Sequence, residues 1–207
     1  MTNQTKRLLL RAENYVTKPW KNGQGVTRDV ILWPASDEFD IRVSLADIPP
    51  VSVFSSFPGI TRHITRLSGD AMTLTFADGQ VATLALLTPL TFDSAKAPSC
   101  EASGADLRVL NVMTRTTSWR SSVRVLAEGR HRVAPPTDGV LLLFAAAGSW
   151  MVGSAPCSTG ETLLAMGGTA GIDMTGAPGA KALLATLEPM VPGQNLAFGF
   201  FEAIGRN

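Results

Sequence analysis

Two arginines stand in stretches whose alternation otherwise places apolar side chains on one face of a strand. In the run 26–32, a period of two places Arg28 on the same face as Val26, Val30 and Leu32. A buried guanidinium without a partner costs several kcal/mol. Arg28 therefore pairs with a carboxylate of the protein, reaches solvent or awaits an anionic ligand, and the sequence leaves these three alternatives open.

The run 40–47 alternates in the same way, with Arg42 and Ser44 on the face opposite to three apolar side chains. If the Arg42 face looks into a cavity, the guanidinium fork and the hydroxyl suit bidentate binding of a carboxylate. If it looks outward, Arg42 is a solvated surface arginine. Alternation alone gives the two interpretations equal weight.

Asn111 and Trp20 are two further candidates for a binding site. Asn111 shares a strand face with Val109 and Met113, and a buried amide requires hydrogen-bond partners. It either ties down a neighbouring backbone in the core or lines a pocket. Trp20 lies in the run 18–25, where Asn and Gly favour a turn, so it forms either a pocket rim or the anchor of an ordinary turn.

Few residues of this sequence could bind a metal ion or act as a catalytic nucleophile. The chain has two histidines, His63 and His131, far apart, whereas a metal site on a β-barrel ordinarily requires two or three imidazoles and a carboxylate. We therefore expect no metal and no cofactor, with His63 at a surface or strand end and His131 in a solvated loop. The common nucleophile, phosphate-loop and dinucleotide motifs are missing from the sequence. An enzyme would have to use Asp29, Asp47 or His63 for proton transfer.

Composition sets the broad class. The chain has 207 residues, of which 45% are hydrophobic, and a formal net charge of +1. That is enough apolar material for a core, and the near-neutral charge argues against a nucleic-acid partner. The longest apolar stretch, 140–147, is far shorter than the roughly 20 residues that span a bilayer. With no secretory signal visible at the N-terminus, we expect a cytoplasmic protein without a membrane partner, in which Cys100 and Cys157 are free thiols.

Short apolar runs separated by Gly, Pro, Asp and Ser predict a mainly β fold. The clearest element is a hairpin over 71–87, in which Asp78 and Gly79 supply the turn. Comparable strands are predicted at 26–33, 40–45, 107–114, 122–127, 140–146, 162–166 and 181–187, a spacing that suits a barrel or sandwich.

Other segments bear on the internal organisation. Residues 49–57 and 93–106 are expected to be irregular, and frequent glycines after residue 148 predict very short strands. A turn followed by an apolar strand occurs at 68–72 and again at 159–163, which hints at two related halves.

Three blocks of sequence in combination resemble the HutD/Ves family. They are KPWKNGQGVTRD at 18–29, FDIRVSLAD at 39–47 and FSSFPGITR at 54–62, and LNVMTR at 110–115 is similar to a later block of that family. Two positions depart from the pattern: Gln24 replaces a glycine, and an apolar residue at 109 or 110 replaces an acidic one. The resemblance implies a cupin-like β-barrel, as one bicupin unit over 1–207 with cupin-type halves at about 1–100 and 101–207.

Carried over position by position, the resemblance implies eight ligand-binding residues. They are Trp20, Asn22, Thr27, Arg28, Arg42, Ser44, Arg62 and Asn111. The family's association with bacterial histidine-utilisation genes implies a small acidic metabolite as the ligand. A dicarboxylate requires cationic forks and neutral donors in a partly dry pocket, which these residue types supply. Gly23, Gly25, Pro58 and Gly59 are expected to shape the backbone.

These observations favour a metal-independent protein that binds a small carboxylate, with formylglutamate or another histidine-degradation intermediate as the candidate. Its role would be regulation or moderation of flux in histidine utilisation, with binding rather than turnover expected. The alternatives are a metal-free isomerase or amide hydrolase, and a protein-interaction module with a vestigial pocket. Cupin-type proteins often dimerise through strands, so a homodimer is also considered.

Overall fold

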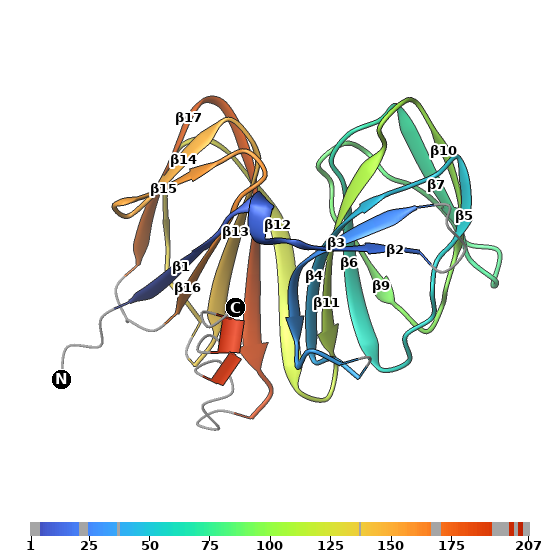
Figure 1. Cartoon of the computed structure of the whole chain (residues 1–207), viewed down its shortest axis with the longest axis horizontal. Helices are drawn as coiled ribbons and strands as arrows, with labels where there is room; N and C mark the ends of the chain where they lie inside the picture. Colours follow the sequence, from blue (N-terminus) through green and yellow to red (C-terminus); the bar gives the residue numbers. More distant parts are fainter. Residues whose placement is uncertain are drawn as a thin grey trace. The chain divides into compact units, whose positions relative to one another are not determined.

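The computed structural model describes residues 5–20, 25–36, 38–136, 138–166, 171–191, 199–200 and 203–204. Strands dominate these residues, which confirms the mainly β prediction (Figure 1). The chain forms two compact units, one of Tyr15–Thr117 and the other of Met1–Asn14 with Ser118–Asn207. No helix in the described part of the chain is long and apolar enough to cross a membrane.

The Tyr15–Thr117 unit consists of two antiparallel sheets in its described residues. The larger sheet has the order β2 (Val16–Pro19), β3 (Val26–Trp33), β4 (Ile41–Asp47), β11 (Arg108–Arg115), β6 (Ile60–Arg66) and β9 (Leu90–Asp93). The smaller sheet has the order β5 (Val51–Val53), β10 (Ser99–Ser103), β7 (Ala71–Thr75) and β8 (Val81–Thr83). Ile64 and Val109 of the larger sheet share one buried cluster with Met72, Leu74 and Cys100 of the smaller. The two sheets therefore enclose a single core.

The predicted hairpin is confirmed as β7 and β8. Thr73 lies opposite Thr83, and Gly79 adopts a φ of 83° in the turn. The returning strand ends at Thr83, short of the predicted residue 87. The chain leaves the smaller sheet there because Leu86 forms a bridge to Arg66 in the larger one.

The other unit has one sheet in its described residues. Its order is β1 (Lys6–Leu10), β16 (Thr162–Met166), β13 (Val140–Ala147), β17 (Ile172–Pro189), β14 (Ser149–Val152) and β15 (Ala155–Ser158), and β12 (Trp119–Val133) also pairs with β17. A short 3-10 helix, η1 (Ala12–Asn14), follows β1. The core of this unit is apolar and includes Leu143, Trp150, Leu163 and Leu184.

Several expectations about irregular segments are wrong. After residue 148, β14, β15 and β16 have 4, 4 and 5 residues, as the glycines predicted, but β17 spans 18 residues. Its partner β12 spans 15 residues and is longer than the predicted strand at 122–127. At Gly129, which has a φ of 103°, the register shifts, so the glycine forms a bulge that lets the strand continue. Residues 93–106 contain β10 and residues 49–57 contain β5, because backbone pairing there does not need an alternating apolar pattern.

Both thiols are buried and free, and burial raises the pKa of Cys100 to about 11 and that of Cys157 to about 12. We expect neither to react with a thiol reagent such as dithionitrobenzoate at pH 8 in the folded protein, because the thiolate is the reactive form. Both should react once the chain is unfolded in guanidinium chloride. Rapid labelling of the native protein would contradict this assignment.

Candidate functional site

A β-bulge determines which side chains of β3 face the barrel interior. The register with β4 shifts between Asp29 and Ile31, so that Val30 is an extra residue. Simple alternation fails beyond this point. Leu32 faces the same side as Asp29, whereas Arg28 faces the opposite side. The expectation that Arg28 and Leu32 share a face is therefore wrong.

Two rows of side chains cross the inner face of the larger sheet. One row consists of Asp29, Ser44, Asn111 and Ile64. The next row consists of Leu32, Arg42, Met113, Arg62 and Phe92. Cross-strand pairing thus gathers polar groups that are scattered along the sequence.

These rows contribute to a cavity of about 590 Å³ within the Tyr15–Thr117 unit. Six of the eight predicted ligand-binding residues line it, namely Trp20, Thr27, Arg42, Ser44, Arg62 and Asn111. Asn22 lies outside the described residues, and Arg28 is not part of the lining. For Arg42 and Ser44 the structure selects the cavity-facing alternative.

Arg62 is a buried cation without an acidic partner among the described residues. The residue is 4% exposed, and its guanidinium carbon lies 5.3, 5.5 and 5.8 Å from the ring centroids of Phe54, Phe57 and Phe92. Nη2 donates to the Ser55 carbonyl at 3.3 Å, whereas the buried Nε has no hydrogen-bond partner. Burial and the charge of Arg42 lower the pKa of Arg62 to about 10, so the group stays charged at neutral pH. No described acidic side chain neutralises this guanidinium, which can therefore bind an anion.

Arg42 and Lys18 share one carboxylate at the cavity wall. Arg42 Nε donates to Asp29 Oδ1 at 2.8 Å, and Lys18 Nζ lies 3.1 Å from Asp29 Oδ2. The Asp29 side chain is only 3% exposed, so water screens these pairs weakly. With Arg62, the cavity and its immediate wall hold three cations against one carboxylate. The local excess is two positive charges.

Trp20 forms part of the rim, and its ring position depends on Gly25. The indole Nε1 donates to Thr27 Oγ1 at 2.8 Å, and the Trp20 backbone N–H donates to the Gly25 carbonyl at 2.9 Å. A Cβ atom at Gly25 would lie 2.8 Å from the ring. Glycine is therefore required for this close approach, as the sequence predicted for a residue that shapes the backbone.

Asn111 is 5% exposed and lines the cavity, and its Oδ1 has no hydrogen-bond partner. Its cross-strand neighbour Ser44 also lines the cavity. The alternative in which Asn111 ties down core backbone is not supported by any contact among the described residues. The amide belongs to the pocket.

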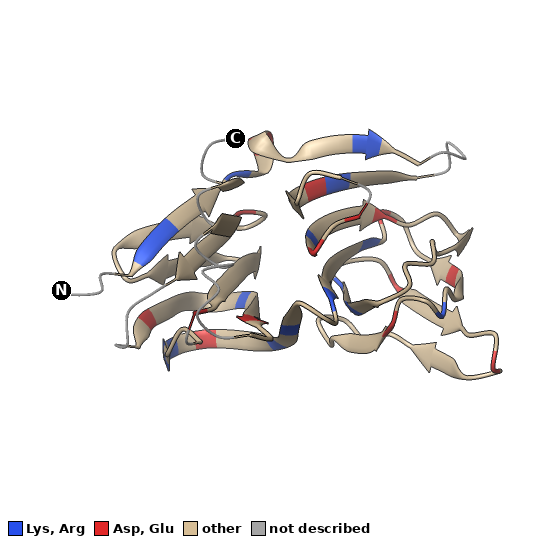
Figure 2. Cartoon of the chain, turned by 90° about the horizontal axis from the view of Figure 1, so that it is seen from below, with Lys and Arg blue, Asp and Glu red and all other residues tan. Residues whose placement is uncertain are grey.

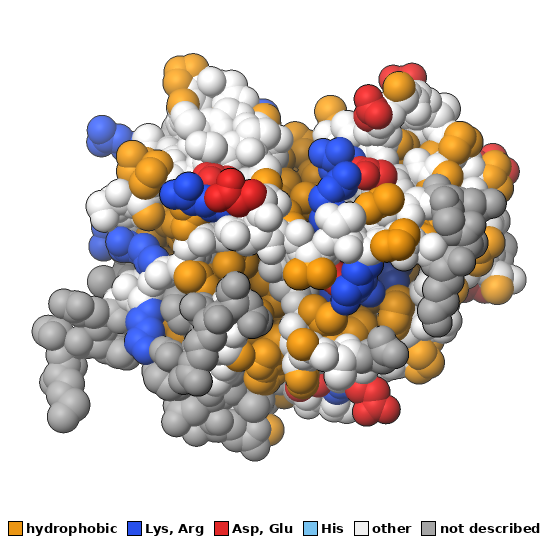
Figure 3. Space-filling view, in the orientation of Figure 1, with side chains coloured by type: hydrophobic (Ala, Val, Ile, Leu, Met, Phe, Trp, Pro, Cys, Tyr) orange, Lys and Arg blue, Asp and Glu red, His pale blue; other side chains and the backbone are white. Residues whose placement is uncertain are grey.

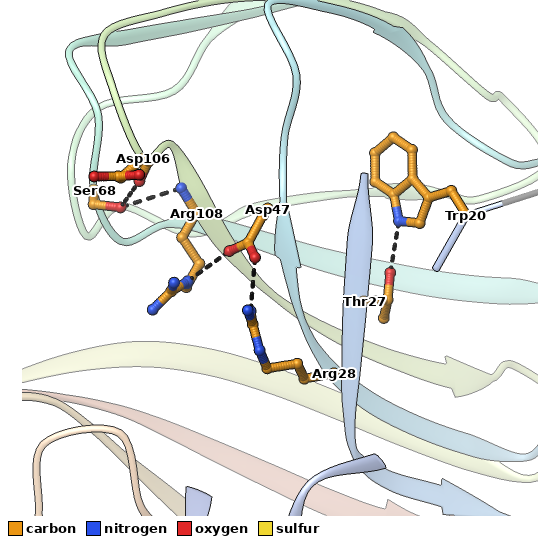
Figure 4. Close-up of polar contacts among 7 residues, drawn as sticks. All are labelled: Trp20, Thr27, Arg28, Asp47, Ser68, Asp106 and Arg108. Carbon is orange, nitrogen blue, oxygen red and sulfur yellow. Dashed lines mark hydrogen bonds and ion pairs between the residues drawn. The ribbon is translucent and has the colours of Figure 1, made fainter. Parts of the chain in front are cut away.

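Arg28 forms an ion pair with a carboxylate of the protein on the outer face of the larger sheet. Its Nη1 donates to Asp47 Oδ2 at 2.8 Å, and Arg108 Nε donates to Asp47 Oδ1 at 2.8 Å. Figure 4 shows this group on one side of β3, and Trp20 with Thr27 on the other. Partial burial raises the pKa of Asp47, but the hydrogen bonds and charges of Arg108 and Arg28 outweigh it and lower the pKa below its usual value.

The histidines do not lie where they were expected. His63 is buried in β6 at 5% exposure, with Nδ1 2.7 Å from Thr91 Oγ1, because a strand covered on both faces leaves no exposed position there. His131 lies within β12, with Nε2 2.7 Å from the Ala127 carbonyl oxygen, and not in a loop. Among the residues that the structure describes, no group of three or more His, Cys, Asp or Glu side chains could hold a metal ion.

The aromatic wall of the cavity was not predicted. Phe39, Phe54 and Phe57 line it, and the Phe39 and Phe57 rings pack edge to face with centroids 5.5 Å apart. Phe54 and Phe57 lie in a segment without strand periodicity just before Pro58 and Gly59. Two phenylalanines in such a loop are the sequence feature that could have indicated this wall.

Charge over the chain is mixed in sign, with basic and acidic residues on strands of both units (Figure 2). On the Tyr15–Thr117 unit, Figure 3 shows Lys and Arg side chains lying among hydrophobic ones. The lining of the cavity contains Lys18, Arg42 and Arg62 and no acidic residue among those described. Such a pocket can bind a small anion with apolar parts.

Comparisons with known proteins place these features in a family. The profile of the HutD family matches residues 12–182. A 21.2 kDa protein of the hutC 3′ region in Pseudomonas putida is 34% identical over 140 residues, 66% of this chain and 73% of that protein. Protein Ves of Citrobacter koseri is 33% identical over 136 residues, 65% of this chain and 70% of Ves.

Solved structures agree with the sequence comparisons. HutD from Pseudomonas fluorescens SBW25, in a formate condition, superposes with a TM-score of 0.79 at 27% identity, covering 90% of this chain and 100% of that chain. At 10% identity, the pirin YhhW of Escherichia coli covers 89% of this chain and 100% of that chain with a TM-score of 0.66. Oxalate decarboxylase of Lactobacillus farciminis, also 10% identical, covers 89% of this chain and 87% of its own with a TM-score of 0.62. These last two likenesses show the fold alone and confirm the cupin-like β-barrel.

The ion pairs of Asp47 with Arg28 and Arg108 make the free energy of unfolding depend on pH in a defined direction. Because the folded pKa of Asp47 is lowered, its stabilisation is present above the unfolded value of 3.8 and is lost as pH falls through the folded pKa. We expect Asp47→Asn to lower the free energy of unfolding by about 1 kcal/mol at pH 7, the upper end for screened pairs. Urea unfolding should show this difference shrinking below pH 3.8.

The matched control is Asp173→Asn, which removes a more exposed pair with Arg132 at 2.9 Å and should change stability by less than about 0.5 kcal/mol. A difference for Asp47→Asn that persists unchanged at low pH would show that its carboxylate charge is not the cause.

Proposed function

The chain belongs to the HutD family, and on that premise we propose that its barrel pocket binds a small carboxylate metabolite without a metal. The observation that carries this proposal is Arg62, a cation buried in the cavity without an acidic partner among the described residues. A charge in that position is costly unless a counter-ion arrives. The ligand supplies that counter-ion.

The charge of the lining residues and the volume of the cavity favour a ligand that carries two negative charges and has the size of a small metabolite. The excess of two positive charges around Asp29 matches two carboxylates, one for Arg62 and one for Arg42 with Lys18. The volume of about 590 Å³ lies within the range of roughly 300–1,000 Å³ that is usual for small-molecule pockets. The phenylalanines of the wall provide contact area for the carbon chain that joins the carboxylates.

Binding is favoured over turnover by the positions of the groups considered for proton transfer. Asp47 pairs with two arginines on the outer face, and Asp29 is occupied by Arg42 and Lys18. Neither they nor His63 belong to the cavity lining. A metal-free isomerase or hydrolase would need a base or acid in contact with its substrate.

The relative in the hutC 3′ region supports histidine utilisation as the context. Formylglutamate or another acidic intermediate of histidine breakdown is the candidate ligand. Bound to this protein, it would regulate or moderate flux through that pathway.

A thermal-shift panel with histidine, urocanate, formiminoglutamate, formylglutamate and glutamate tests the proposal, each with and without a chelator. At a hundred times its dissociation constant, a ligand adds about 2.7 kcal/mol, which raises the Tm of a chain of this length by roughly 5–10 °C. We expect such a rise with a dicarboxylate and no effect of the chelator. No shift with any acid would overturn the proposal, and loss of the shift with chelator would overturn metal independence.

Replacement of Arg62 separates a ligand-binding role from a structural one. In Arg62→Met, the loss of cation–π contacts is offset by removal of a desolvated charge, so we expect unliganded stability to stay within about 1 kcal/mol of wild type. Ligand binding should be lost, and Arg62→Lys should retain part of it. Arg28→Gln, on the other face of β3, is the control that keeps full binding. Loss of more than about 3 kcal/mol in Arg62→Met would instead make Arg62 a structural residue.

A further inference from the structure

The guanidinium of Arg62 lines the cavity, yet most of it is covered by other side chains. The residue is 4% exposed, and its Nε atom is buried without a hydrogen-bond partner. Nη2 donates to the Ser55 carbonyl at 3.3 Å, and three phenylalanine rings lie against the group. An arginine binds a carboxylate through its N–H donors. A carboxylate therefore reaches the buried Nε only when one of the covering side chains moves.

The three rings on Arg62 are held in different ways. Phe92 lies opposite Arg62 in the neighbouring strand β9 and packs edge to face against Phe76, with centroids 5.3 Å apart. Phe54 packs against the core that the two sheets enclose. Phe57 is half-buried in the connection between β5 and β6, outside any strand and outside that core. Of the three rings, Phe57 is the one that can move with least disruption of the barrel.

A second hollow gives the Phe57 ring a place to move to. This hollow has a volume of about 330 Å³, and Pro58, Ile60 and Arg115 are among its lining residues. Phe57 lines both the hollow and the cavity that contains Arg62. A cavity of about 150 Å³ can hold a benzene molecule. The hollow is therefore large enough to receive the phenyl ring.

The turn after Phe57 confines this movement to the side chain. The Ile60 N–H donates to the Phe57 carbonyl at 3.3 Å, and Gly59 has a φ of 74°, so that Phe57 and the next three residues form a type II turn with Pro58 at its second position. The Phe57 N–H donates to the Ser94 carbonyl at 2.9 Å. Because both backbone groups of Phe57 are bonded, the ring changes position by rotation of the side chain.

Resting on the proposed carboxylate site, we propose that Phe57 is a movable cover of Arg62. In the empty pocket the ring lies on the guanidinium, and anion binding displaces it into the hollow. The cation–π contact stabilises the covered state, so the ring competes with the ligand. The hollow, which Glu38 also lines, is filled when the ligand is bound. Occupancy of the pocket thus changes the protein surface beside Glu38, which is the kind of differential state that a regulatory protein without turnover requires.

Stopped-flow fluorescence with N-formyl-L-glutamate and with glutarate tests the cover, with Trp20 at the rim of the cavity as the reporter. Phe57→Leu keeps an apolar side chain at this position but removes the ring that covers the cation. We expect its association rate constant to exceed that of wild type by about 3- to 30-fold, because the uncovered fraction of molecules is no longer limited by a cation–π contact.

Two further variants separate the cover from a general effect of losing a ring. Phe92→Leu removes a ring that stays on Arg62 in both states, and its association rate should remain within about twofold of wild type. Glu38→Phe places a bulky side chain at an exposed position of the hollow and should slow association at least about fivefold. The double variant Phe57→Leu with Glu38→Phe should again associate fast, because no ring then needs the hollow.

The outcomes separate this inference from the proposed function. Equal association rates in wild type and Phe57→Leu would overturn the cover and leave the carboxylate site standing. Slow association that persists in the double variant would show that the phenylalanine at position 38 blocks the pocket itself, which would overturn the role of the hollow. Glu38→Phe keeps the test decisive if the Phe57 variant does not fold. If neither acid binds wild type, both the proposed function and this inference fail.

Discussion

The pocket of the Tyr15–Thr117 barrel depends on one buried cation, the guanidinium of Arg62. This group lies against the rings of three phenylalanines. The cation–π contacts reduce the cost of desolvation but supply no counter-charge. The nearby carboxylate, Asp29, pairs with Arg42 and Lys18 instead. The cavity therefore holds a buried cation, and Phe54 and Phe57 of its aromatic wall lie against that charge.

The bulge at Val30 is the local feature that makes this arrangement available. Without this extra residue, side chains would alternate regularly along the whole of β3, and Arg28 and Leu32 would share a face. The extra residue places Leu32 on the interior face together with Asp29, whereas Arg28 lies on the other face, next to Asp47. One inserted residue thus keeps the apolar Leu32 of the cavity lining on the same face as Asp29, which pairs with Arg42.

Sequence periodicity predicted much of the fold and part of the site, and its failures have specific causes. Alternation grouped Arg42 with Ser44 correctly because β4 runs without a bulge, and it marked Asn111 as a polar residue on an apolar face. It wrongly placed Leu32 on the face of Arg28, because no residue type in β3 signals the bulge. His63 was expected at the surface because a single strand does not reveal that both its faces are covered. Glycines after residue 148 suggested short strands, yet β17 continues through Gly176 and Gly179, the second of which has a φ of 78°.

The contrast between the two faces of the larger sheet is the strongest argument that the cavity is a binding site. On the outer face, Arg28 and Arg108 both meet Asp47, and their charges are largely satisfied within the protein. On the inner face, Arg62 Nε and Asn111 Oδ1 are buried without hydrogen-bond partners in the described residues. Folding alone favours removal of such groups, since apolar replacements of similar volume avoid their desolvation cost. A ligand that brings a carboxylate to Arg62 and a hydrogen-bond donor to Asn111 would pair both groups, and its binding energy would offset their cost of desolvation.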